Sequence, residues 1–250
     1  MASGDDAPLL YRSLHTVLPP VFSALWRPTA TGTEHVPKEG PAILASNHLS
    51  FIDHFFLPMF IERPIFFLGK SDYFKGPKRL FFESVGVMPV AREGGDAGEA
   101  SLRKGQEILE AGKLLGIYPE GTRSPDGRLY RGKTGPARLA LRTGVPILPV
   151  AMVGTYEVLP PGARIPRFSK VEVRIGAPLD FSRYQGGEND RFVLRSATDE
   201  LMYELMLLSG QPYVDEYAAK VKSGEVIIGS GDLEELGRLM DDEVPARSAG

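Results

Sequence analysis

The sequence contains no cysteine at all. This absence excludes disulfide bridges, thiolate nucleophiles and cysteine-ligated metals. Histidine is scarce as well, with four residues in 250, and the carboxylates do not gather into a ligand set. The sequence therefore predicts no bound metal and no resident cofactor.

Long apolar runs are also missing. No stretch approaches 18 uninterrupted apolar residues, so we expect no transmembrane helix. The first six residues are small and acidic, unlike a secretory signal. What remains, 42% apolar and 24% charged residues, is the composition of an ordinary globular protein.

The small net charge of −3 conceals an asymmetry along the chain. Residues 120–142 hold six Lys or Arg against two acids, whereas residues 181–250 hold 14 acids against seven Lys or Arg. The basic middle favours an anionic ligand or surface. The acidic end argues against a nucleic-acid-binding protein.

Strand-like and helix-like patterns alternate along the chain, and this alternation predicts an α/β fold. We expect one domain at 28–220 with a largely parallel or mixed central sheet of about seven strands, flanked by helices. A helical segment precedes it at 1–27, and an acidic, loosely ordered tail follows at 221–250. The expected strands lie at 31–36, 41–46, 64–68, 86–91, 113–118, 146–152 and 170–175, and the expected helices at 97–111, 134–143 and 190–209.

Two stretches mix aromatic and basic side chains, at 9–26 and at 73–82. Such a mixture is typical of a helix that lies in a membrane interface. It is equally typical of an amphipathic helix that covers the core of the protein. The sequence leaves both interpretations open.

A histidine and a carboxylate lie five residues apart where a buried strand turns into a helix. On one continuous helix, residues five apart do not face each other, so His48 must lie in the turn and Asp53 in the first helical turn if they are to meet. Ser50 and Asp53 have the spacing of a capping box with an acid variant. The alternative is a purely structural role, in which Ser50 and Asp53 cap the helix and His48 is a solvated turn residue.

Polar residues also follow three of the predicted strands: Asn47–His48, Arg92 and Glu120–Arg123. Ligands of parallel α/β sheets bind outside the carboxyl ends of the strands, so these residues are candidates for one shared pocket. The two arginines have the fork geometry that phosphate favours, and Gly121 lets the backbone approach a ligand closely. The acid and the arginine of the third group could instead form a surface salt bridge.

Four short segments now stand out in order. Residues 47–53 read N-H-x-S-x-x-D, 86–92 form a glycine-opened strand that closes on arginine, 118–124 read Y-P-E-G-T-R-S, and 145–150 read V-P-I-L-P-V. Over about residues 28–180 the chain resembles the glycerolipid acyltransferase family, of the 1-acylglycerol-3-phosphate (lysophosphatidate) acyltransferase type. Residues 190–219 are similar to actinobacterial members. The second segment departs from the family pattern at Ala91, where an acid often precedes the arginine, and Tyr118 replaces a phenylalanine.

The resemblance implies a transferase of phospholipid synthesis. Such an enzyme moves a fatty acyl group from an acyl thioester, either acyl-CoA or acyl carrier protein, to the hydroxyl of a lysophosphatidate-type acceptor. It implies that His48 is the general base and that Asp53 orients its ring, with Asn47 and Ser50 in support. The acceptor hydroxyl is itself the nucleophile, so no acyl-enzyme is expected.

The resemblance also implies partners and a location. The enzyme is expected to be peripheral, at the cytosolic face of the cell membrane, with the acyl donor, the glycerolipid acceptor and the membrane surface as its partners. The residues expected to hold the acceptor phosphate are Lys70, Arg92, Glu120, Gly121, Thr122, Arg123 and Lys133.

Other functions compete with this one. The acceptor could be glycerol 3-phosphate, another lysophospholipid or a glycolipid, and a non-catalytic lipid-binding protein could carry the same motifs. Residues 127–134 match the nucleotide-binding pattern G-x-x-x-x-G-K-[ST] letter for letter. The context of that match is poor, because the preceding strand is expected to end nine residues before the first glycine.

Overall fold

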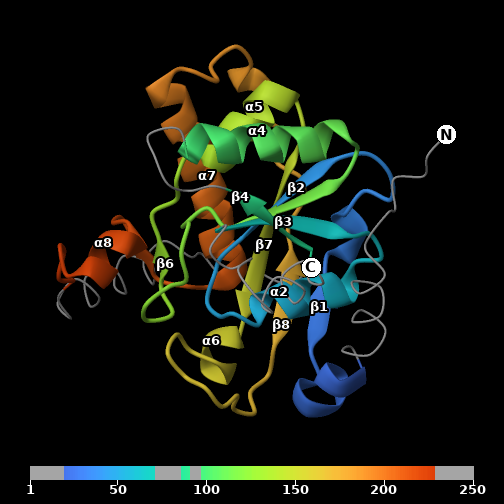
Figure 1. The fold of residues 1–250 in the computed structure, drawn as a ribbon, viewed down its shortest axis with the longest axis vertical. Coiled ribbons are helices and arrows are strands. Elements are labelled where there is room, and N and C mark those ends of the chain that lie inside the picture. The colour runs from blue at the N-terminus through green and yellow to red at the C-terminus, as the bar shows by residue number, and fades with distance from the viewer. Residues whose placement is uncertain (1–19, 71–85, 91–96, 229–250) are drawn as a thin grey trace, which may run out of the picture.

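A mixed seven-stranded sheet forms the centre of the computed structural model, which describes residues 20–70, 86–90 and 97–228 (Figure 1). The strand order is β1-β8-β7-β2-β5-β3-β4, and every neighbouring pair is parallel except β7 and β8. The predicted α/β class with a largely parallel sheet is confirmed. The strands are β1 Thr29–Thr31, β2 Ala42–Ser46, β3 Ile65–Lys70, β4 Val87–Val90, β5 Leu114–Ile117, β7 Ile147–Val153 and β8 Glu172–Ile175.

Both faces of the sheet are covered, which explains why its central strands are apolar throughout. In β2, Ala42 and Leu44 belong to one buried cluster, whereas Ile43 and Ala45 belong to another on the opposite face. The second cluster contains the apolar faces of α4 Ala97–Glu110, α5 Gly135–Thr143 and α7 Arg191–Ser209. The first contains α2 Asp53–Phe56 and η2 Leu57–Phe60, and helical residues 20–26 pack against it.

The predicted strand over 31–36 is wrong. Strand β1 ends at Thr31, and Thr33–His35 form the 3-10 turn η1. The cause is Gly32, whose φ of 74° lies in the left-handed region that glycine tolerates. A Cβ at this position would lie 1.9 Å from the carbonyl oxygen of Ile175, so only glycine fits at this bend.

A second, two-stranded sheet was not predicted. It pairs β6 Leu129–Tyr130 in parallel with β9 Tyr213–Val214, and α8 Ala218–Ser223 packs on Tyr130. Strand β6 occupies the middle of the segment that matches the nucleotide-binding pattern. Its backbone pairs with β9 and Tyr130 is fully buried, so this segment is not a phosphate-wrapping loop.

Several predicted features lie outside the described residues: the beginning of the 9–26 stretch, the whole of 73–82, Arg92, and the part of the tail beyond residue 228. The short helix α6 Thr155–Val158 completes the elements used below. Within the described ranges, no helix combines the length and apolarity needed to cross a bilayer.

Candidate active site

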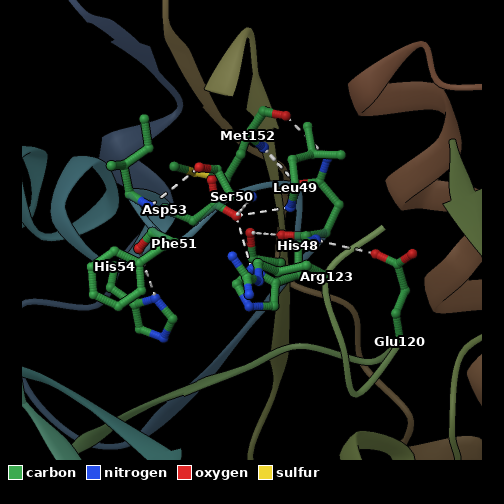
Figure 2. A network of polar contacts seen from close by, with 12 residues as sticks. His48, Leu49, Ser50, Phe51, Asp53, His54, Glu120, Arg123 and Met152 are labelled. Carbon is green, nitrogen blue, oxygen red and sulfur yellow. Dashed lines mark hydrogen bonds and ion pairs between the residues drawn. The ribbon is translucent and has the colours of Figure 1, made fainter. Parts of the chain in front are cut away.

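The turn after β2 brings His48 onto Asp53, the first residue of α2 (Figure 2). The Nδ1 atom of His48 lies 2.9 Å from Oδ2 of Asp53. An ionised carboxylate can only accept, so this contact assigns the proton to Nδ1 and leaves Nε2 with a free lone pair. Oδ2 also accepts the backbone N–H groups of Leu49, at 2.8 Å, and Ser50, at 2.9 Å. The buried carboxylate thus fixes both the shape of the turn and the tautomer of the imidazole.

The capping box is present only in part. Asp53 reaches back to the N–H of Ser50, as the acid of such a box does. The hydroxyl of Ser50 does not return to the helix. It donates to the carbonyl oxygen of Leu159, at 2.6 Å. Ser50 therefore ties the His48 turn to the residue that follows α6.

Aromatic rings enclose the imidazole of His48. The ring of Tyr118 stacks on it with centroids 3.8 Å apart and planes 14° apart, and His54 meets it edge-on at 5.5 Å. Only 12% of the His48 side chain remains exposed. A ring stacked this closely restricts rotation of the imidazole and holds it in the plane that faces Asp53.

The backbone of His48 is held by the loop that follows β5. Its N–H donates to Oε1 of Glu120, at 3.1 Å, and its carbonyl accepts the N–H of Ser124, at 2.7 Å. The other oxygen of Glu120 accepts the N–H of Tyr130, at 3.0 Å. Burial raises the pKa of Glu120 to about 8, although both N–H donors lower it.

This position of Glu120 differs from both sequence-based interpretations. The residue is 1% exposed and braces two loops, so it is neither a partner in a surface salt bridge nor turned outward as a phosphate ligand. The sequence could not indicate this, because both of its partners are backbone groups.

Cations gather around Gly121–Arg123. Gly121 has a φ of 72°, and a Cβ on it would lie 3.1 Å from Nζ of Lys133, so that lysine crosses directly over the glycine. Lys222 of α8 donates to the hydroxyl of Thr122, at 3.0 Å, and to the carbonyl oxygen of Arg123, at 2.5 Å. Partial burial and then the charge of Arg123 lower the pKa of Lys222. The loop thus collects positive charge from three separate parts of the chain.

Sequence reasoning missed Lys222. It lies 99 residues beyond Arg123 in a segment whose net charge is acidic, and its spacing carries no motif. Of the other predicted cations, Lys70 ends β3 with only its backbone described, and Arg92 lies outside the described residues.

Asn47 anchors the His48 turn to strand β7. Its amide donates to the carbonyl oxygen of Met152, at 3.0 Å, and accepts the N–H of the same residue, at 2.7 Å, which fastens the end of β2 to β7. It also donates to Gln211, at 2.6 Å, and Gln211 in turn donates to the carbonyl oxygen of Gly127. Gln211 is a second supporting residue that the sequence did not indicate.

His54 was not predicted either. Its pKa is lowered to about 4 by burial first and then by the charge of His48, whereas Asp53 and a hydrogen bond to the carbonyl of Phe51 oppose the shift. His54 is therefore neutral at pH 7 and packs beside His48 without competing for its proton. No cluster of three potential metal ligands occurs among the residues that the structure describes.

The model of the Acyltransferase family matches residues 27–153, just over half of the chain. This chain belongs to the Acyltransferase family. The matched region of this acyltransferase-family protein contains the His48–Asp53 pair and the Gly121–Arg123 loop, whereas Gln211 and Lys222 lie beyond it.

Individual relatives carry more specific names. A chloroplastic 1-acyl-sn-glycerol-3-phosphate acyltransferase of Arabidopsis thaliana is 34% identical over 155 residues, which cover 61% of this chain and 43% of that protein. A 1-acyl-sn-glycerol-3-phosphate acyltransferase of Borreliella burgdorferi is 31% identical over 126 residues, half of each chain. The acyltransferase-family chain thus spans half or less of the length of these curated relatives.

A solved structure extends the comparison to the fold. The crystal structure of the 1-acyl-sn-glycerophosphate acyltransferase of Thermotoga maritima matches with a TM-score of 0.63 and 28% identity, covering 78% of this chain and 79% of the other.

Proposed function

We propose that this protein transfers a fatty acyl group from a thioester donor, acyl-CoA or acyl carrier protein, to the free hydroxyl of a 1-acyl-sn-glycerol 3-phosphate. The observation that carries the proposal is the 2.9 Å contact between His48 and Asp53 beside the cation-rich Gly121–Arg123 loop. The names of the relatives support the same acceptor. An intact pair of this kind argues against a purely lipid-binding protein.

In the proposed reaction, Nε2 of His48 takes the proton of the acceptor hydroxyl as that oxygen attacks the thioester carbonyl carbon. The new C–O bond forms, and the carbonyl π electrons move onto oxygen. Collapse of this intermediate breaks the C–S bond, and the departing sulfur takes the proton back from His48. Asp53 stabilises the imidazolium that exists between these steps, and the stacked ring of Tyr118, whose centroid lies 3.8 Å from that of the imidazole, holds the ring in place. The products are the ester and a free thiol, with no covalent bond to the enzyme.

The acceptor phosphate is proposed to bind at the Gly121–Arg123 loop, with Arg123, Lys133 and Lys222 as its cations. Three positive charges on one loop suit a phosphate of two negative charges. Binding there delivers the acceptor hydroxyl to the neighbouring His48, because both loops are joined through Glu120 and Ser124. Lys70 and Arg92 remain proposed contributors. Glu120 acts as the brace between the loops.

The purified protein should be incubated with one of two donors, acyl-CoA or acylated acyl carrier protein. Each donor is tested in separate reactions with lysophosphatidate, glycerol 3-phosphate and lysophosphatidylcholine. Thiol release and product mass report the transfer. We expect phosphatidate from lysophosphatidate and little turnover of the other two. Faster reaction of another acceptor would replace the proposed substrate. Absence of thiol release with every acceptor, from acyl-CoA and from acyl carrier protein, would overturn the proposed activity.

A further inference from the structure

The segment between α6 and β8 leaves large apolar side chains uncovered. Ile165 is 80% exposed and Phe168 is 81% exposed. Val21 and Leu25, on the helical residues 20–26, are 49% and 43% exposed. Apolar side chains gathered at such exposure mark an interaction surface when they adjoin one another.

The two segments do adjoin. The indole N–H of Trp26 donates to the carbonyl oxygen of Arg167, at 2.8 Å. Trp26 and Phe22 also pack on Phe56 of α2, with ring centroids 6.1 and 5.1 Å apart. Figure 1 shows the first blue helix and the yellow loop after α6 at the same end of the molecule. They form one surface, which we call the docking face: residues 20–27 and 160–170.

The charge of the docking face has one sign. Arg164, Arg167 and Lys170 alternate with the two apolar residues of the loop, and residues 158–171 contain no Asp or Glu. All three cations are exposed, and none pairs with an acid among the described residues. In such a surface the apolar side chains suit the acyl chains of an anionic bilayer, and the unpaired cations suit its headgroups.

The docking face is also fixed to the candidate active site. The loop starts directly after Leu159, whose carbonyl accepts the hydroxyl of Ser50 in the His48 turn, at 2.6 Å. The N–H of Arg167 returns to the carbonyl of Val158, at 2.8 Å, so the loop is closed on itself. A membrane bound at this face would lie near the His48 turn.

We propose that residues 20–27 and 160–170 dock this protein on anionic phospholipid bilayers, with Ile165 and Phe168 among the acyl chains and the loop cations at the headgroups. The sequence had indicated 9–26 and 73–82 for this role and had not indicated the loop. The inference goes beyond the proposed function and does not require it, since binding is measured without substrate.

The test is sedimentation of the full chain with vesicles of phosphatidylcholine, alone or mixed with phosphatidylglycerol. The double variant Ile165→Ser/Phe168→Ser should partition onto the mixed vesicles at least about tenfold less than the wild type. The matched control is Phe192→Ser, which is 86% exposed but follows the opposite end of β8, at the start of α7. It should bind as the wild type does.

A second variant in the same experiment, Arg164→Gln/Arg167→Gln/Lys170→Gln, tests the contribution of the loop cations. This variant should bind mixed vesicles at low salt about a hundredfold more weakly, and added salt should erase the difference. Circular dichroism and transfer to a short-chain soluble acceptor should be unchanged in both loop variants, which separates docking from folding and catalysis. Wild-type binding by either loop variant, or equal weakening by Phe192→Ser, would overturn the proposal.

Discussion

One carboxylate oxygen organises the residues that carry the proposed chemistry. Oδ2 of Asp53 accepts from the ring of His48 and from two backbone N–H groups of the same turn. Hydrogen bonds to an ionised acceptor are the stronger ones, so the turn and the ring orientation are set by the same group. Replacing Asp53 therefore changes the hydrogen-bond acceptor of the His48 ring and leaves the ring itself unaltered.

Asp53→Asn should lower kcat by about two to four orders of magnitude, because an amide does not stabilise an imidazolium and can impose the wrong tautomer. The acceptor KM should change little, since the Gly121–Arg123 loop is not altered. His48→Ala should reduce kcat at least as far. Steady-state kinetics on well-folded protein measure both. Near-wild-type turnover by His48→Ala would remove the general base from the mechanism.

His54 gives the fold a defined sensitivity to acid. Its pKa falls from 6.5 to about 4 on folding, so between these values the unfolded chain binds a proton that the folded chain does not. Stability contributed by the neutral ring is complete above pH 6.5 and is lost as the pH falls toward 4. The difference between these two pKa values corresponds to a loss of about 3 kcal/mol in the free energy of unfolding when the pH falls below both.

Urea titrations at pH 7 and pH 4.5 should therefore show a smaller acid-induced loss of stability in His54→Asn than in the wild type, by about 2–3 kcal/mol. Each protein is compared with itself at the two pH values, so the cost of the substitution at neutral pH cancels. Equal losses in both proteins would show that His54 does not keep its lowered pKa.

The local strand, turn and helix signals allowed a contact between His48 and Asp53, and the family resemblance predicted it. The sequence could not predict the stacking of Tyr118 on His48 or the clamp between Asn47 and Gln211. Those contacts join residues 70 and 164 positions apart, and no spacing rule reaches so far.

At the scale of elements, α8 has a role out of proportion to its six residues. It packs on Tyr130 through Ala218 and extends Lys222 to the oxygens of Thr122 and Arg123. Its other lysine, Lys220, lies instead 3.8 Å from Glu216. Lys222 is therefore a test residue for the loop, and Lys220 on the same helix is its matched control.

Lys222→Met should raise the KM for lysophosphatidate by about 10- to 100-fold, the equivalent of a lost charged hydrogen bond of roughly 1.5–3 kcal/mol. Arg123→Ala should do the same. Lys220→Met should leave KM unchanged. The KM for a glycerolipid acceptor without phosphate should be the same in all three variants as in the wild type. An equal effect of Lys222→Met on both acceptors would assign the lysine to the structure of the loop.

Apart from the strand over 31–36, the ends of the predicted buried strands and of the three predicted helices lie within two residues of those observed, because their periodicity spans a whole element. The strand over 31–36 failed at Gly32, where a single left-handed residue ends the pairing. Strands β6 and β9 were missed because two residues have no periodicity. Their pairing is decided by the burial of Tyr130, which is visible only in the folded chain.

For the whole molecule, the strand order explains why two distant motifs form one site. β2 and β5 are parallel neighbours, so their carboxyl ends meet, and the His48 turn follows one as the Gly121–Arg123 loop follows the other. Sequence reasoning predicted that strand ends would share a pocket. It did not predict the order β1-β8-β7-β2-β5-β3-β4, which depends on how helices cover both faces.

Truncation tests how the C-terminal part is attached. A chain that ends after Gln211 loses β9 and α8 and exposes Tyr130, so it should be less stable by about 2–4 kcal/mol. A chain that ends after Ile228, which removes the rest of the predicted loosely ordered tail, should keep its melting temperature. Differential scanning calorimetry compares the three lengths. A large loss after truncation at Ile228 would contradict the predicted tail.

The position of Lys222 outside the shared 27–153 region has a consequence for how such proteins diverge. The proposed proton-transfer pair, His48 and Asp53, and the proposed headgroup cation Lys222 lie in separate parts of the chain. Exchanging residues 212–228 between relatives would then alter selectivity for the headgroup while the reacting pair keeps its intrinsic rate. From the proposed roles we expect selection to act on these two properties independently, and we expect an engineered exchange of one to leave the other intact.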